Sequence, residues 1–158
     1  GDGDRRQILH AHLGWLADAP EASRAEYARS FALSRADRSG GYESPFWGQQ
    51  YAATLSRMLY QPSDPPRDDL FREYETLLLE TMRPAARHTE AARLERVKKM
   101  YLRGGKADTP ERMRYKKTLL ERALREMEAL ARSGASSADV LFTRVRALRA
   151  YSRLLPAP

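Results

Sequence analysis

The 158-residue sequence contains no cysteine and no long apolar run. The absence of cysteine excludes disulfides, thiolate nucleophiles and cysteine-ligated metal sites together. No apolar stretch approaches the ~18 residues that a membrane-spanning helix needs, so we expect a soluble protein with no membrane span. The chain begins Gly-Asp-Gly-Asp rather than with Met. A cytoplasmic location fits this start, and so does a periplasmic or secreted one after removal of a signal segment.

Motifs of catalysis and cofactor binding are also absent. There is no Gly-x-Ser-x-Gly nucleophile elbow and no dinucleotide fingerprint, and Gly104-Gly105-Lys106 lacks the following Ser/Thr of a phosphate loop. His10 and His12 are two residues apart, which directs them to different sides of a helix rather than toward one metal ion. We therefore predict no cofactor, no metal site and no catalytic residue.

Negative charge is scarce in the second half of the chain, and this asymmetry is the strongest feature of the sequence. Residues 1–80 carry 9 Lys/Arg against 13 Asp/Glu, a net charge of −4, whereas residues 81–158 carry 19 against 8, a net charge of +11. Such a field attracts a polyanion or an acidic protein surface. Of the 28 basic residues 23 are arginines. Arginine suits bidentate contacts with carboxylates or phosphates. The alternative reason for the high arginine content is a GC-rich, bacterial-like genome, whose codons favour arginine.

Apolar spacing is helical nearly everywhere, with no strand-like alternation of useful length. Ser44-Pro45, Thr109-Pro110 and Ser137 are typical helix starts, because Ser and Thr cap the first turn and Pro fits its first position. Pro84 disfavours helix at the residue before it, so we favour a break there; the alternative is one helix that kinks at Pro84 and continues to Leu102. The fold class is therefore all-α: a helical bundle of about six or seven antiparallel helices with a long basic C-terminal helical hairpin.

The predicted core follows from the same spacing. The inward-facing positions are expected at Ile8, Leu9, His12, Leu13 and Leu16; Tyr27 and Phe31; Trp47, Tyr51, Leu55, Met58 and Leu59; Leu70, Phe71, Tyr74, Leu77 and Leu78; Leu94, Val97 and Met100; Met113, Leu120, Leu124, Met127 and Leu130; and Val140, Leu141, Val145, Leu148 and Tyr151. We predict a single helical domain over residues 1–158. Its sub-layers 5–61 and 67–155 are joined by the proline-rich segment 62–66.

The basic segment 96–117 is the main candidate site. Two similar strings of cations flank one turn, and each contains a tyrosine. Basic side chains with interleaved aromatic rings suit phosphate contacts and base stacking; the alternative is a solvated helical pair whose tyrosines cover the edge of the core. The predicted partner- or polyanion-binding residues are Arg96, Lys98, Lys99, Tyr101, Arg103, Lys106, Arg112, Arg114, Tyr115, Lys116 and Lys117.

The aromatic string around residues 42–51 is a second candidate. Tyr42, Phe46 and Trp47 follow a Gly-Gly pair, and such side chains make good interface anchors. The alternative is that Phe46 and Trp47 fill the core between helices, as large apolar residues usually do.

The arginines of the last predicted helix do not indicate a membrane-binding face. Arg144, Arg146, Arg149 and Arg153 are unevenly spaced and do not form one narrow face. We therefore expect this helix to be packed against the bundle rather than to lie on a membrane surface.

Three functional hypotheses remain at this point. We expect a non-enzymatic helical interaction protein, such as an adaptor, a chaperone-like factor, an inhibitor or a soluble domain of a larger assembly, that docks an acidic protein surface through its basic C-terminal half. The alternative is a nucleic-acid-binding protein that uses the basic hairpin 96–117. The second alternative is an enzyme with a dispersed carboxylate/His site, built from Glu73, Glu75, His88 or His12. A homo-oligomer held by the oppositely charged halves is also compatible with the charge pattern.

Overall fold

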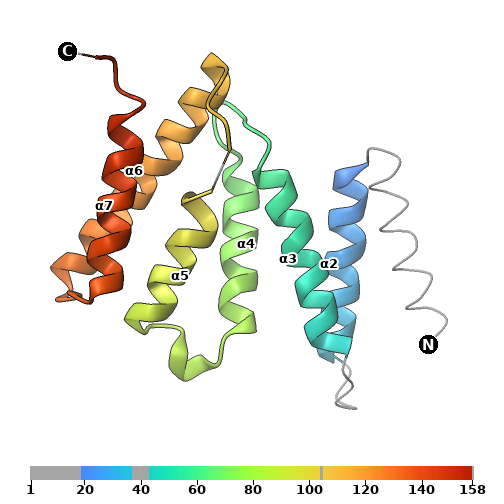
Figure 1. Cartoon of the computed structure of the whole chain (residues 1–158). Coiled ribbons are helices and arrows are strands. Elements are labelled where there is room, and N and C mark those ends of the chain that lie inside the picture. The colour runs from blue at the N-terminus through green and yellow to red at the C-terminus, as the bar shows by residue number, and fades with distance from the viewer. Residues whose placement is uncertain (1–18, 37–42, 104, 158) are drawn as a thin grey trace. The chain divides into compact units, whose positions relative to one another are not determined.

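The computed structural model describes residues 19–36, 43–103 and 105–157, and every regular element within them is a helix (Figure 1). The helices are α2 (Pro20–Ala36), α3 (Glu43–Leu59), α4 (Asp68–Thr81), the short 3-10 helix η1 (Pro84–Ala86), α5 (Glu90–Tyr101), α6 (Pro110–Arg132) and α7 (Ala138–Ser152). The predicted all-α fold class is confirmed. The helix expected around Ile8–Leu16 lies outside the described residues.

The chain divides into two compact units, residues 1–59 and 60–158. In the first unit α2 packs against α3. In the second unit α4, α5, α6 and α7 succeed one another as antiparallel neighbours, and each packs against the next (Figure 1). The proline-rich segment 62–66 therefore belongs to the second unit.

Aromatic side chains form the core between α2 and α3. The ring centroids of Tyr27 and Trp47 are 6.3 Å apart, and those of Phe31 and Tyr51 are 6.2 Å apart. All four residues are buried, as their helical spacing predicts. The small side chain of Ser30 is buried beside them, and small residues let two helices approach each other closely.

The helical pattern is broken at Pro84, as the sequence predicts. α4 ends at Thr81, and Arg83 adopts an extended backbone with ψ of 137° because the ring of the following proline excludes the helical conformation. α5 begins after Thr89, whose hydroxyl accepts a hydrogen bond of 3.2 Å from the backbone N–H of Ala92. The turn between them reverses the chain, so α5 returns alongside α4.

The predicted caps of α6 and α7 are confirmed. Thr109 and Ser137 each accept a hydrogen bond from the backbone N–H three residues ahead, at 3.2 Å and 3.3 Å. α6 ends at Arg132, and Gly134 follows it with a φ of 89°, a backbone conformation that suits a residue without a side chain. The N–H of Ala135 then donates to the carbonyl of Leu130 at 3.1 Å, which closes a Schellman motif.

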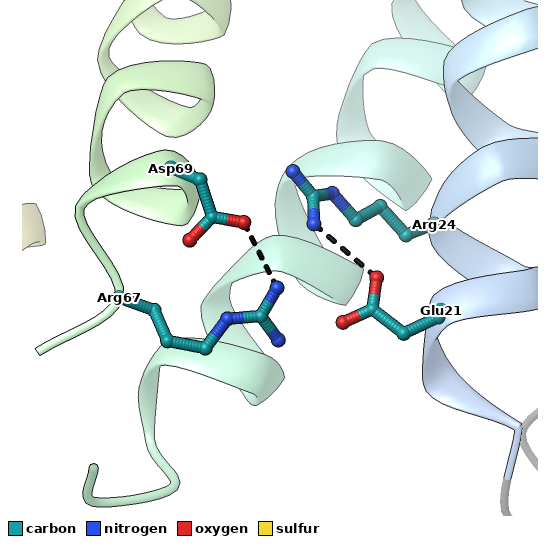
Figure 2. Close-up of polar contacts among 4 residues, drawn as sticks. All are labelled: Glu21, Arg24, Arg67 and Asp69. Atoms are coloured by element: carbon teal, nitrogen blue, oxygen red, sulfur yellow. Dashed lines mark hydrogen bonds and ion pairs between the residues drawn. The ribbon is translucent and has the colours of Figure 1, made fainter. Parts of the chain in front are cut away.

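Two helix starts carry local ion pairs (Figure 2). In the first turn of α2, the carboxylate of Glu21 accepts a 3.2 Å hydrogen bond from the guanidinium of Arg24. At the start of α4, the carboxylate of Asp69 accepts a 2.9 Å hydrogen bond from the guanidinium of Arg67, the residue that precedes the helix. Each carboxylate lies in a first helical turn, where the positive end of the helix dipole stabilises it.

The core of the second unit is centred on α6. The buried cluster joins Leu94 and Val97 of α5, Ala123, Met127 and Leu130 of α6, and Val140 of α7. Two positions of α6 differ from the predicted stripe, because Met113 is exposed and Leu124 is half-buried. The buried stripe of α6 thus begins at Tyr115.

The predicted inward face of α7 is wrong at three of its five positions. Leu141, Val145 and Leu148 are 54%, 53% and 47% exposed, whereas the buried residues of this helix are Val140, Thr143 and Ala147. The reason is that α7 packs closely against α6 alone. Within the second unit α7 therefore buries only the stripe that faces α6, and this stripe includes the small side chains of Thr143 and Ala147.

Buried and exposed leucines of the second unit should respond differently to truncation to alanine. We expect Leu130→Ala to lower the free energy of unfolding by about 3 kcal/mol, because this fully buried side chain leaves a cavity. Leu148→Ala is the matched control and should cost about 0.5 kcal/mol or less, because its side chain is already half in water. Urea unfolding followed by circular dichroism measures both; equal losses would contradict the observed orientation of α7.

Candidate functional site

The candidate segment 96–117 covers the end of α5, the connecting residues and the first turns of α6. Much of its charge is neutralised locally. The structure pairs Arg96 with Glu75 at 3.6 Å, Lys99 with Glu95 at 3.7 Å, Arg112 with Asp108 at 2.7 Å and Arg114 with Asp64 at 3.3 Å. The hydrogen bond from Arg112 also lowers the pKa of the Asp108 carboxyl below its usual value. Partly exposed pairs of this kind add little stability, but they reduce the charge that the segment offers to a partner.

The acidic residues that precede α5 supply part of this neutralisation. Asp64, Asp68 and Glu75 accept ion pairs from Arg114, Arg122 and Arg96, and all six residues belong to the second unit. Counted by units instead of by sequence halves, residues 1–59 carry 7 Lys/Arg against 7 Asp/Glu, and residues 60–158 carry 21 against 14. The whole net charge of +7 therefore resides in the second unit.

The two tyrosines of the segment lie at the edge of the core. Tyr115 is buried, and Tyr101 is half-buried with its ring centroid 5.7 Å from that of Phe71. Burial raises the pKa of both phenols above the ordinary value. These positions match the alternative in which the tyrosines cover the core, and the buried ring of Tyr115 offers no surface for a base to stack on.

Arg103 is held in a fixed position after the end of α5. Its guanidinium carbon lies 5.1 Å from the ring centroid of Tyr60 and 5.6 Å from that of Tyr74. Its Nε donates a 3.0 Å hydrogen bond to the carbonyl of Lys99. Cation–π contacts and this hydrogen bond therefore orient the side chain before any ligand is present.

A basic cleft of about 370 Å³ opens beside Arg103. Its lining residues are Leu102 and Arg103 after α5, Lys116 and Leu120 of α6, and Arg146, Arg149, Ala150 and Arg153 at the C-terminal end of α7. Five of these eight side chains are cationic and none is acidic. Lys116 is positioned by a 3.1 Å hydrogen bond from its Nζ to the carbonyl of Gly105. Of the predicted site residues, the cleft unites only Arg103 and Lys116.

The three arginines from α7 were missed in the sequence. Arg146, Arg149 and Arg153 are three and four residues apart, so they share one face of the helix. Arg144 lies off this face, and grouping it with the others hid the regular spacing. The spacing alone gives the shared face, but only the packing of α7 on α6 places that face opposite Arg103 and Lys116.

A hydrogen bond between helices helps to fix this end of α7. The hydroxyl of Tyr151 donates to Glu121 Oε1 at 3.1 Å, from α7 to α6. The bond to Glu121 raises the pKa of the Tyr151 phenol. Because Tyr151 lies between Arg149 and Arg153 in the chain, the bond holds the turn that carries both arginines against α6.

A second surface of α7 is apolar and exposed. Leu141, Val145 and Leu148 are spaced i, i+4 and i+7, so they form one helical face. Phe142 is 62% exposed beside this apolar face, and the Arg146 guanidinium lies 5.9 Å from its ring centroid. Contiguous exposed apolar side chains are typical of interaction surfaces.

The aromatic string of the sequence is divided by the structure. Trp47 is 2% exposed and packs against Tyr27, whereas Phe46 is 39% exposed and meets the Trp47 ring edge-on at 5.3 Å. Tyr42 lies outside the described residues. Of this candidate interface, only Phe46 therefore presents a described side chain at the surface.

The dispersed carboxylate/His site falls only partly within the described residues. His88 is exposed after η1, and the described part of the chain provides no ion pair for it. Glu75 is engaged with Arg96, and His10 and His12 lie outside the described residues. Within residues 19–36, 43–103 and 105–157 no group of three or more His, Asp or Glu side chains could hold a metal ion.

Comparison with protein-family models, with curated proteins and with solved structures finds no significant match for this chain. Among the helices of the described residues, none combines the length and the hydrophobicity that crossing a bilayer requires. The site must therefore be interpreted from its own chemistry.

The buried tyrosines should make the protein less stable in alkali. Burial raises the pKa of Tyr74, Tyr101 and Tyr115, so the folded state holds these protons more tightly than the unfolded chain does. The stabilisation is complete below the unfolded value of about 10 and is lost as the pH rises through the folded values. We expect the free energy of unfolding, measured with urea, to fall above about pH 10, and Tyr115→Phe to make this fall less steep. A free energy that stayed constant with pH would contradict the burial of these phenols.

Proposed function

We propose that this protein is a non-enzymatic helical interaction protein that docks an acidic protein surface through its basic C-terminal half. The observation that carries the proposal is the exposed apolar face of α7, formed by Leu141, Val145 and Leu148. A helix that presents such a face within a charged unit has the chemistry of a docking element, because burial of apolar area supplies affinity.

The charge of the second unit favours an acidic partner. This unit carries the entire net charge of +7, and Arg144 lies on the same helix as the apolar face. Arginine and aromatic residues are enriched at protein interfaces, where a few of them dominate the binding energy. A complementary acidic rim on the partner would accelerate association and fix its orientation.

Self-association through opposite charges is not part of this proposal. The acidic segment that precedes α5 lies in the same unit as the basic segment, and Asp64, Asp68 and Glu75 already pair with arginines there. The first unit is electrically neutral by count. The two halves of the sequence are therefore not two surfaces of opposite charge.

Docking is tested by substituting the apolar face. The full chain, immobilised, is exposed to nuclease-treated lysate of its own source at low and moderate salt, and captured proteins are quantified by mass spectrometry. We expect Leu141→Ser with Leu148→Ser to reduce capture of an acidic protein at least about tenfold, because two central apolar contacts are lost.

The matched control is Leu33→Ser with Met113→Ser, which also changes two exposed apolar side chains outside this face. This control should capture the same protein as the unmodified chain does. Equal capture by both double variants, or no protein retained after nuclease, would overturn the proposal. Retention at moderate salt is expected, because apolar contacts are not screened by ions.

Nucleic-acid binding through the segment 96–117 is the second candidate. It is supported by Lys98, Lys106 and Lys117, for which the described residues provide no carboxylate partner. These lysines supplement the cations of the neighbouring cleft. A protein of this kind binds phosphates largely without regard to sequence.

Salt dependence distinguishes this candidate from protein docking. If about six phosphates are contacted, affinity for a labelled single-stranded oligonucleotide should fall about 300-fold between ~50 and ~200 mM salt. Fluorescence anisotropy measures this fall. Lys98→Gln, Lys99→Gln, Lys116→Gln and Lys117→Gln together should weaken binding and flatten the dependence; unchanged binding would exclude the segment as the contact surface.

A further inference from the structure

We propose that the cleft lined by Arg103, Lys116, Arg146, Arg149 and Arg153 is a binding site for a phosphomonoester group. This site is separate from the apolar face of α7, and it stands whether or not that face docks a protein. Three features support this assignment: the cations that gather in the cleft, the size and lining of the cleft, and the negative charge that these cations would bind.

The first step is that the cations of the cleft differ from those cations of the same unit that are already paired with carboxylates. Six other cations of the second unit, Arg67, Arg96, Lys99, Arg112, Arg114 and Arg122, each have a carboxylate within 3.7 Å. In the described part of the chain, no carboxylate forms an ion pair with Lys116, Arg146, Arg149 or Arg153, as is also the case for Lys98, Lys106 and Lys117 outside the cleft. Lys116, Arg146, Arg149 and Arg153 therefore bring to the cleft positive charge that no described carboxylate neutralises.

The second step is that three separate parts of the chain bring these cations together. Arg103 follows α5, Lys116 lies on α6, and the remaining arginines lie on the last turns of α7. Like charges gathered around one space repel each other, and an anion in that space removes the repulsion. Arg103 and Lys116 are already oriented by their contacts with Tyr60, Tyr74 and a backbone carbonyl, so part of the site is formed before binding.

The third step is the size and lining of the space. A volume of about 370 Å³ lies at the lower end of small-ligand sites, which begin at roughly 300 Å³. Leu102, Leu120 and Ala150 provide an apolar wall beside the cations. The cleft thus fits a compact anionic head with a short apolar or backbone portion next to it.

The fourth step is the choice of anion. A phosphomonoester carries a charge of about −1.5 to −2 at neutral pH and presents three acceptor oxygens. Guanidinium groups bind such oxygens through paired N–H donors, and three guanidinium groups approach from one helix face and a fourth from Arg103. A carboxylate has one charge and two oxygens, so it would leave more of the cations unsatisfied.

The group has two sources, a free phosphorylated metabolite or a phosphorylated side chain of a protein, and the experiment distinguishes them. Isothermal titration of the full chain at low salt uses five probes: inorganic phosphate, acetate, O-phosphoserine, a short phosphoserine peptide flanked by alanines, and the same peptide with serine. We expect binding of the phosphorylated probes and none of the serine peptide. Tighter binding of O-phosphoserine assigns a free ligand, whereas tighter binding of the phosphopeptide assigns a protein side chain.

The variant Arg149→Gln with Arg153→Gln tests the location. Both side chains are exposed on the last turns of α7, so we expect the fold to be retained, with an unchanged circular dichroism spectrum. Affinity for the best phosphorylated probe should fall at least about tenfold, because two charge-assisted hydrogen-bonding groups are lost. Arg72→Gln with Arg83→Gln is the matched control, since it removes the same charge from exposed positions of the same unit outside the cleft. We expect it to change affinity less than about twofold at moderate salt.

Three results would overturn the inference. The first is the absence of binding of every phosphorylated probe up to ~10 mM. The second is an equal loss of affinity in the cleft variant and the control variant, which would assign binding to net charge alone. The third is equal affinity for acetate and for inorganic phosphate, which would contradict the proposed class of ligand. The variant Leu141→Ser with Leu148→Ser should bind phosphate normally, so a failure of protein docking and a failure of this site give different results.

Discussion

The burial of α6 against both of its neighbours is the constraint on which the second unit depends. Ala123, Met127 and Leu130 are completely inaccessible to solvent and meet α5 on one side and Val140 of α7 on the other. Because α5 and α7 both run antiparallel to α6, their C-terminal ends arrive at the same end of that helix. The basic cleft lies where these ends meet, so its existence follows from the way the core is packed.

α7 packs closely against α6 alone, so it presents three stripes with different surroundings. Its buried stripe includes Thr143 and Ala147, which leaves its larger apolar residues outside. A second stripe carries the arginines of the cleft, and a third carries Leu141, Val145 and Leu148. An apolar surface and an anion-attracting surface are thus held in fixed relation by a single rigid element, bound to α6 through Tyr151 and Glu121.

The distribution of charge in the folded chain differs from its distribution along the sequence. The acidic residues before α5 are near the basic ones in the fold, and Asp64, Asp68 and Glu75 neutralise arginines of α5 and α6. Part of what remains positive lines the cleft beside Arg103, where none of the lining side chains is a carboxylate. The sequence asymmetry therefore overstated the charge of the segment 96–117 and did not indicate the contribution of α7.

The sequence by itself determined most helix starts and stops, because these depend on local chemistry; the start of α3 differs from the prediction, since this helix begins at Glu43 rather than after Ser44. The caps at Thr109 and Ser137, the break at Pro84 and the stop at Gly134 depend on neighbouring residues alone. Only the tertiary structure decided which stripe of α7 is buried, because a helix with several apolar faces buries the one that its neighbour accepts. The tertiary structure alone also decided the cleft, because its cations lie up to fifty positions apart in the chain. No local sequence pattern predicts how α5, α6 and α7 pack together.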